Sequence, residues 1–137
     1  MTGTDRPLRV LHVLEALSAG TSRHLIDLVR HVEGVEHLVA IPTERVGYAS
    51  DRVAERRLRD AGAEVHVVEM RRLPVHPRNL VALAALSRII RRREPDLVHT
   101  HSAIGGVLGR AAAAARRVPS VYTPNGLPPG RVAETVE

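Results

Sequence analysis

The 137-residue sequence contains no cysteine, tryptophan or phenylalanine, and its aromatic content is limited to two tyrosines. Without cysteine the chain can form neither disulfides nor thiolate metal sites, so cysteine usage does not restrict its compartment. The core must be built from valine, leucine, isoleucine and alanine, because little else apolar is present. This composition is typical of a parallel sheet covered by alanine-rich helices.

Long apolar runs are also missing. No stretch approaches the roughly 18 apolar residues that a membrane-spanning helix needs. The first ten residues, MTGTDRPLRV, lack the apolar region of a secretory signal. We therefore expect a cytoplasmic protein, and its length favours a single domain over residues 1–137.

Lysine is absent as well, so all 20 basic residues are arginines, and the formal net charge is +5. Guanidinium groups bind phosphate well, which makes nucleic acid the first partner to consider. However, aromatic residues for base stacking and recognition motifs are missing, so we expect no nucleic-acid partner. A phosphorylated small molecule or an anionic membrane surface fits better. The arginines at 71, 72, 78 and 91–93 could touch lipid headgroups from the inner face of a membrane.

Apolar segments and amphipathic segments alternate along the chain. Strands are predicted at 8–14, 37–41, 63–70, 97–101 and 119–123, and helices at 22–32, 50–61, 79–93 and from 102 onward, with a further helix at 131–137. We expect Ser50 and Asp51 to begin the second helix, and Val53, Leu58, Leu80 and Leu86 to face the core. This alternation predicts an α/β domain with a doubly wound parallel sheet, in strand order 3-2-1-4-5.

The segment DLVHTHSAIGGVLG (96–109) combines a strand end with the start of a glycine-rich helix. Each glycine weakens a helix by about 1 kcal/mol relative to alanine, so Gly105, Gly106 and Gly109 require a reason. Either the helix packs closely on the sheet or the backbone approaches a ligand. Both readings remain open from the residues alone.

Two histidines, His99 and His101, point to one face of this strand, and His12 lies on a neighbouring strand. A metal site is conceivable, but no cysteine or suitably spaced carboxylate accompanies them, so we predict no metal. Histidines in this setting are commonly hydrogen-bonded core residues. His101 stands at the strand end, where we expect its ring to be partly accessible and able to reach a ligand.

The loop after the first strand contains neither a dinucleotide fingerprint nor a Walker A motif, so NAD and ATP binding of those kinds are not expected. Gly20, Thr21 and Ser22 open a helix, which makes either an anion site or a simple helix cap. With strand order 3-2-1-4-5, this loop and the loop at 101–106 should flank one crevice.

Three segments, in order, resemble one known family: LRVLHVLEALSAGTSRHLIDLV, DLVHTHSAIGGVLGRAAAA and VPSVYTPNG. They look like the N-terminal domain of family 4, GT-B-fold glycosyltransferases. The resemblance implies a Rossmann-like half of an enzyme that moves a sugar from a nucleotide-sugar donor to an acceptor with retention of configuration. It implies a hexosyltransferase-type activity in cell-envelope or exopolysaccharide synthesis, with a glycan or lipid-linked acceptor and no further cofactor.

The resemblance also assigns roles to residues. Ala19, Gly20 and Thr21 match the family's donor-phosphate loop, and His101 matches the catalytic histidine beside the transferred sugar. Ser102, Gly105 and Asn125 fall on the acceptor and sugar side. Ala19 stands where a second glycine is usual, Ile104 where lysine is frequent, and Asn125 where histidine is frequent.

The family's C-terminal donor-binding domain has no counterpart in these 137 residues. We therefore expect the acceptor-side half of a glycosyltransferase, as a fragment or as a subunit that needs a donor-domain partner chain, and no activity from this chain alone. The alternative is a non-catalytic Rossmann-like domain that binds a partner.

Overall fold

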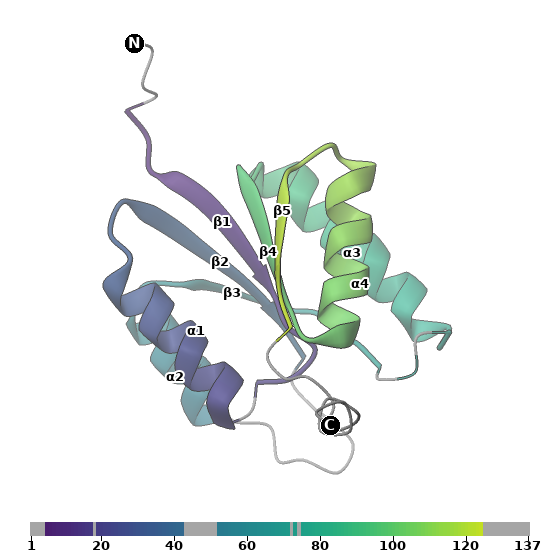
Figure 1. The fold of residues 1–137 in the computed structure, drawn as a ribbon, viewed down its shortest axis with the longest axis horizontal. Helices are drawn as coiled ribbons and strands as arrows, with labels where there is room; N and C mark the ends of the chain where they lie inside the picture. The colour runs from purple at the N-terminus through teal and green to yellow at the C-terminus, as the bar shows by residue number, and fades with distance from the viewer. Residues whose placement is uncertain (1–4, 18, 43–51, 72, 74, 125–137) are drawn as a thin grey trace, which may run out of the picture.

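The computed structural model describes residues 5–17, 19–42, 52–71, 73 and 75–124. Five strands and four helices alternate along this part of the chain (Figure 1). In chain order they are β1 (Leu8–Val13), α1 (Ala19–His31), β2 (Val35–Ile41), α2 (Arg52–Asp60), β3 (Glu64–Val67), α3 (Arg78–Arg93), β4 (Leu97–His101), α4 (Ala103–Ala115) and β5 (Ser120–Thr123).

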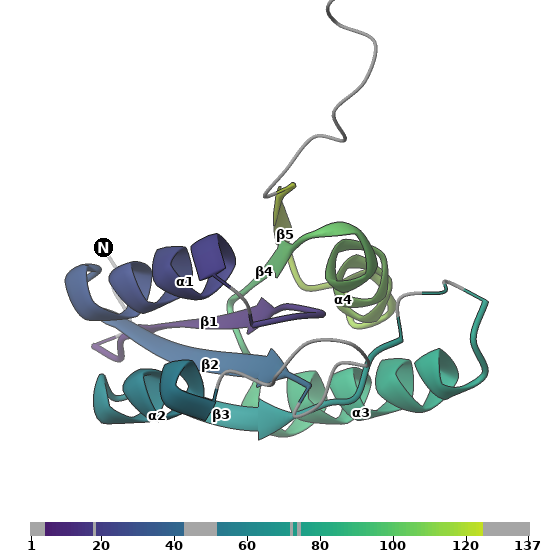
Figure 2. The same cartoon turned by 90° about the horizontal axis from the view of Figure 1, so that it is seen from below.

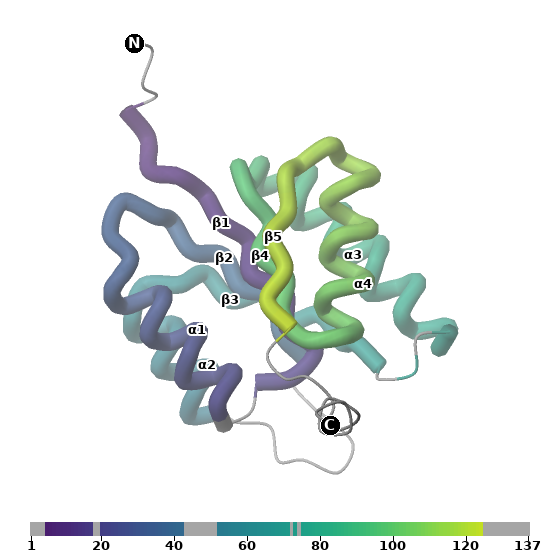
Figure 3. The backbone as a smooth tube through the Cα atoms, viewed as in Figure 1, coloured from purple at the N-terminus to yellow at the C-terminus, as the bar shows by residue number. Residues whose placement is uncertain are grey.

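The strands form one sheet in the order β3-β2-β1-β4-β5, with every pairing parallel, which confirms the predicted topology. Helices α1 and α2 cover one face, and α3 and α4 cover the other (Figures 1 and 2). Because all strands run the same way, their carboxyl ends share one edge. Helices α1 and α4 both begin at that edge (Figure 3).

A separate apolar core lies on each face of the sheet. Leu11, Val13 and Val98 pack under α3 and α4, whereas Val39 and Ile41 pack under α1 and α2. The aliphatic residues predicted from the missing aromatics build both cores. At about 25 cal/mol per Å² of apolar area, this burial is the main force that holds the layers together.

Arginine–carboxylate pairs hold the opposite, amino edge of the sheet. Arg9 Nε lies 2.8 Å from Glu36, and Arg93 lies 2.7 Å from Glu64. The backbone N–H of Arg9 and the guanidinium of Arg6 both donate to Asp96, and they lower the pKa of that carboxyl. The fixed charges of these pairs thus lie away from the edge where α1 and α4 begin.

Several predicted element boundaries differ from the structure. Helix α1 begins three residues earlier than predicted, and β3 ends at Val67 rather than at 70. Among the described strands, β3 pairs with β2 alone, and that ladder ends at the pair of Ile41 and Val67. The predicted cap at Ser50 and Asp51 and the predicted helix at 131–137 lie outside the described residues.

Two residues expected in the core are exposed. Val53 and Leu80 both face solvent. In α3 the buried stripe consists of Asn79, Ala82, Leu86, Ile89 and Ile90. Leu80 lies about 100° around the helix from Asn79, which turns its side chain away from the sheet. A single apolar residue next to a stripe is therefore a poor guide to burial.

The glycines of α4 are explained by close packing. A Cβ on Gly105 would lie 3.0 Å from the carbonyl oxygen of Val13, and one on Gly106 would lie 2.6 Å from the Tyr122 ring. A Cβ on Gly109 would collide with the side-chain methyl of Thr100. These glycines let α4 lie directly against β1, β4 and β5, so the first of the two open readings holds for all three.

Candidate functional site

The carboxyl edge of the sheet gathers the residues that the sequence singled out. β1 and β4 are hydrogen-bonded neighbours, so their ends meet at the point where α1 and α4 begin. In open parallel α/β sheets this edge is where ligands bind, because the connections on either side diverge there. His24 of α1 lies with its ring centroid 6.1 Å from that of His101, so α1 and the end of β4 are close in space.

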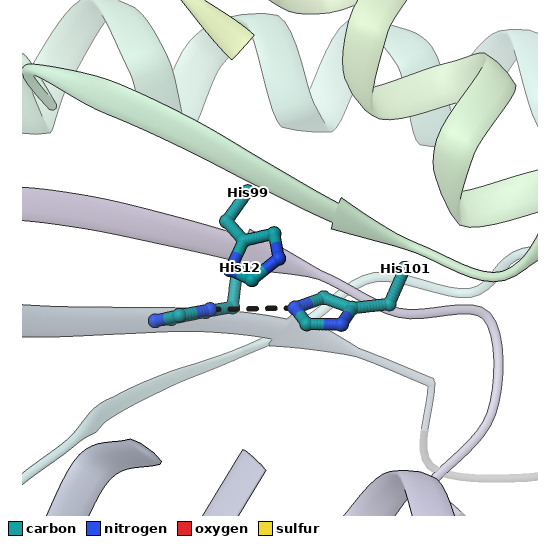
Figure 4. A group of neighbouring side chains, drawn as sticks. All are labelled: His12, His99 and His101. Carbon is teal, nitrogen blue, oxygen red and sulfur yellow. Dashed lines mark hydrogen bonds between the residues drawn. The ribbon is translucent and has the colours of Figure 1, made fainter. Parts of the chain in front are cut away.

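Three histidines form the centre of this region: His12 of β1 and His99 and His101 of β4 (Figure 4). His12 and His99 are paired in register across the two strands, and His101 is two residues further along the same face. The Nδ1 atom of His12 lies 3.4 Å from Nε2 of His101. The ring centroids of His99 and His101 are 4.0 Å apart.

Further polar groups hold these rings. Nε2 of His12 lies 3.1 Å from Nδ1 of His37 on β2, and the two rings are stacked. Nε2 of His99 lies 2.8 Å from the hydroxyl of Thr123 at the end of β5. A line of imidazoles thus crosses three strands on the face covered by α1 and α2.

Burial keeps the central histidines neutral at physiological pH. Desolvation lowers the pKa of His12 well below its usual value, and the neighbouring histidines add to this effect. Desolvation, with smaller contributions from His99 and His24, lowers the pKa of His101 to about 3. The pKa values of His37 and His99 are also lowered, again mainly by burial. The cluster can therefore donate and accept hydrogen bonds but carries no positive charge.

The expectation that the His101 ring is partly accessible is wrong. The side chain is fully buried. Two features of the fold cause this. His24 of α1 lies against the ring from one side, and His12 and His99 pack against it from the sheet side.

Ser102 connects β4 to α4 in an unusual backbone conformation, with φ of 63° and ψ of −178°. This region is almost restricted to glycine, and a non-glycine residue there carries a strain of about 1–3 kcal/mol. The turn is fixed by the N–H of Ser102, which donates to the carbonyl of Thr123, and by the N–H of Gly106, which donates to the carbonyl of Ser102. Strain of this kind clusters at functional turns, so Ser102 remains a candidate residue for the acceptor and sugar side of the site.

The predicted donor-phosphate residues Ala19, Gly20 and Thr21 form the first turn of α1 rather than a preceding loop. The N–H groups of a first helical turn have no partner within the helix and can bind an anion. A Cβ on Gly20 would meet no atom within 4 Å among the described residues, so the backbone is open there.

The other assigned residues divide into two cases. Gly105 is buried against the backbone at the end of β1, where packing by itself accounts for the glycine. Asn125 lies outside the described residues.

Sequence reasoning missed His37, His24 and Thr123 as neighbours of the histidine pair. One signal was available for His37. It alternates with Val39 and Ile41 in the second predicted strand, and the predicted strand order already placed this strand beside His12.

Solved structures share this architecture at low sequence identity. A UDP-N-acetylglucosamine 2-epimerase aligns with a TM-score of 0.64 at 15% identity, over 86% of this chain and 33% of its own. Acinetobacter baumannii MurG aligns with a TM-score of 0.63 at 14% identity, over 85% of this chain and 34% of its own. The calicheamicin glycosyltransferase CalG4 aligns with a TM-score of 0.60 at 17% identity, over 85% of this chain and 32% of its own. The fold is thus an α/β domain of the GT-B type.

The family follows from the sequence. The model of the glycosyl transferase 4-like domain matches residues 9–136, so the chain belongs to that family. EpsD of Bacillus subtilis (strain 168), a protein provisionally named a glycosyltransferase, is 44% identical over 46 residues. That match covers 34% of this chain and 12% of EpsD, and the chain spans about a third of the solved structures above. Among the described residues, no helix is long and apolar enough to cross a membrane.

Proposed function

We propose that this chain is the acceptor-side half of a retaining glycosyltransferase, of the hexosyltransferase type, that uses a nucleotide-sugar donor. The observation that carries the proposal is the meeting of α1 and the β4–α4 turn at one edge, in a domain of the glycosyl transferase 4-like family. The S. aureus MnaA structure, which aligns with a TM-score of 0.59, is described as containing UDP. A nucleoside diphosphate is therefore the donor part that we expect at this edge.

In the proposed site, the backbone N–H groups of Ala19, Gly20 and Thr21 bind the donor diphosphate at the start of α1. His101 serves the transferred sugar as a neutral hydrogen-bonding group, since its lowered pKa removes the charged form. Because the ring is buried, the side chains over it must move before a sugar can reach it. His24 is the ring of α1 that lies against it.

The acceptor side of the proposal is a growing cell-envelope or exopolysaccharide glycan, free or attached to a lipid. Leu73, Val75, Leu80 and Val81 are exposed around the start of α3, which follows the carboxyl end of β3. Arg71 precedes these residues in sequence, and Arg78 lies between Val75 and Leu80. Exposed apolar groups with arginines favour peripheral contact with an anionic membrane, where each cation contributes about 1 kcal/mol. That contact would bring a lipid-linked acceptor to the same edge as the proposed donor site.

A titration of the ¹⁵N-labelled chain with UDP and GDP tests the donor part of the proposal. We expect the amide signals of Ala19, Gly20 and Thr21 to shift in a saturable way, in the presence of EDTA. The amide of Arg117, at the opposite edge, should not move. Shifts confined to other segments, or none with either nucleotide, would contradict the phosphate site.

A further inference from the structure

The histidine cluster has the dimensions of a metal-ligand set. One ligand nitrogen from each of His12, His99 and His101 lies within 4.8 Å of the other two. Two imidazole nitrogens bound to one tetrahedral zinc ion are about 3.3 Å apart, given Zn–N bonds of 2.0–2.1 Å. The His12 Nδ1 to His101 Nε2 distance of 3.4 Å already meets this value. The nitrogens of the other two pairs lie within 4.8 Å, so these rings must approach one another by up to roughly 1.5 Å to bind one zinc ion.

The hydrogen bond of His12 to His37 fits the pattern of a metal-binding histidine. A histidine that binds metal through one ring nitrogen usually donates a hydrogen bond from the other, which fixes the tautomer. His12 has Nδ1 directed at His101 and Nε2 within 3.1 Å of Nδ1 of His37. If Nε2 carries the proton, it donates to His37 and leaves the Nδ1 lone pair directed toward the space between the three rings.

The type of ligand atom determines which metal ions suit the space between the three rings. Each of the three histidines offers one ring nitrogen as a ligand atom, and imidazole binds a metal in its neutral form. Three imidazoles without a carboxylate or thiolate suit zinc, copper or nickel better than magnesium or calcium.

We propose that His12, His99 and His101 bind one divalent transition-metal ion, zinc first, through three imidazole nitrogens at the carboxyl ends of β1 and β4. Three protein ligands leave a fourth tetrahedral position for water or another small ligand. The sequence pointed away from metal because it showed neither cysteine nor a suitably spaced carboxylate. The structure adds the register pairing of His12 with His99, which joins residues 87 positions apart and completes an all-histidine set.

The proposed metal site includes the imidazole ring of His101, which the proposed function assigns to the transferred sugar. The two uses of His101 exclude one another, so bound metal should inhibit sugar transfer. Metal binding can be measured without nucleotide or sugar, and the nucleotide titration above is done in EDTA. Failure of one proposal is therefore distinguishable from failure of the other.

Cobalt(II) is the probe, because the intensity of its visible absorption separates four-coordinate from six-coordinate sites. The purified chain is stripped with EDTA, dialysed and titrated with CoCl₂, and ZnCl₂ is then added. We expect an intense four-coordinate spectrum that saturates at one ion per chain and is abolished by zinc. Zinc should also raise the melting temperature of the chain, because it binds the folded state.

Variants locate the site. His99→Gln removes a ligand and should weaken cobalt binding by more than about a hundredfold. His37→Asn removes only the hydrogen-bond partner of His12 and should weaken cobalt binding by about 10–100-fold. This second variant keeps the test decisive if His99→Gln does not fold. The matched control is His24→Ala, whose ring lies beside the cluster but outside the ligand set. A six-coordinate or absent cobalt spectrum, or a loss in His24→Ala as large as in His99→Gln, would overturn the proposal.

Discussion

The burial of His101 changes the effect on stability that we expect from removing its side chain. A histidine at an exposed strand end could be removed with little effect on folding. His101 instead is fully buried and is within 3.4 Å of His12 Nδ1. Its removal leaves a cavity and a buried nitrogen without this partner.

We predict that His101→Ala lowers the free energy of unfolding by about 1–3 kcal/mol, the usual range for disruption of a buried polar contact. Urea denaturation followed by circular dichroism at pH 7.5, in EDTA, measures this change. The control is His31→Ala, an exposed histidine in the last turn of α1, which should change stability by less than about 0.5 kcal/mol. Equal stabilities of His101→Ala and the native chain would show that the ring contributes nothing to folding.

Ser102 carries backbone strain that a glycine would remove. We predict that Ser102→Gly raises the free energy of unfolding by up to about 1 kcal/mol, since glycine adopts positive φ without steric cost. Thermal unfolding of the two proteins under identical conditions measures the difference. Arg117→Gly is the matched control, because Arg117 also has positive φ but lies after α4. If Arg117→Gly stabilises the chain and Ser102→Gly does not, the serine side chain must compensate its own strain.

Helix α4 depends on glycine for its distance from the sheet. We predict that Gly109→Ala destabilises the domain by about 1–3 kcal/mol, because the new Cβ collides with Thr100 and crowds Val13. Gly20→Ala serves as the control, since it also adds one methyl group to a helix but meets no atom within 4 Å. That substitution should stabilise α1 by up to about 1 kcal/mol through helix propensity. Opposite signs in denaturant unfolding experiments are the expected outcome; equal signs would contradict the packing explanation.

At the scale of elements, the sequence predicted the type and order of every described strand and helix, because apolar periodicity and alternation are local properties. Helix starts were harder to place. Residues 19–21 look like a loop by composition, but they form the first turn of α1. Burial of His101 and the partnership of His12 with His37 depend on register between strands distant in sequence. Residue types and spacing do not determine that register.

The whole molecule should respond to acid through its histidines. The pKa values of His12, His37, His99 and His101 are lowered in the folded chain, whereas unfolded histidine has a pKa of about 6.5. Above that pH neither state binds these protons. Below it the unfolded state binds them and the folded state does not, so stability falls as pH decreases toward the value of about 3 for His101.

We therefore predict a plateau of stability above about pH 6.5 and a decline below it, with a slope of up to about 1.4 kcal/mol per pH unit for each such histidine. Urea unfolding between pH 8 and pH 4.5, in EDTA, measures the profile. His99→Gln should show a shallower decline because it has one fewer titrating group. Stability that stays constant down to pH 5 would contradict the lowered pKa values.

The isolated chain should transfer no sugar. A departing nucleoside diphosphate must be stabilised by cationic or strongly polar groups, which usually supply the largest part of such catalysis. The buried histidines at the carboxyl edge are held neutral and cannot supply that charge. Incubation of the 137 residues with radiolabelled nucleotide sugars and glycan acceptors measures transfer. Sugar transfer by a preparation free of contaminating enzymes would contradict this prediction and the proposal that the chain is only the acceptor-side half of the enzyme.

The strand order also sets when this domain can finish folding. β1 is synthesised first but ends as the central strand, between β2 and a β4 that begins 84 residues after β1 ends. Contacts so distant in sequence must overcome a large loop-closure entropy, which makes parallel sheets slow to form. A chain emerging from the ribosome can pair β1 with β2 early, but His12 meets His99 and His101 only when β4 docks. Formation of the histidine cluster thus indicates that β4 has paired with β1 in the sheet.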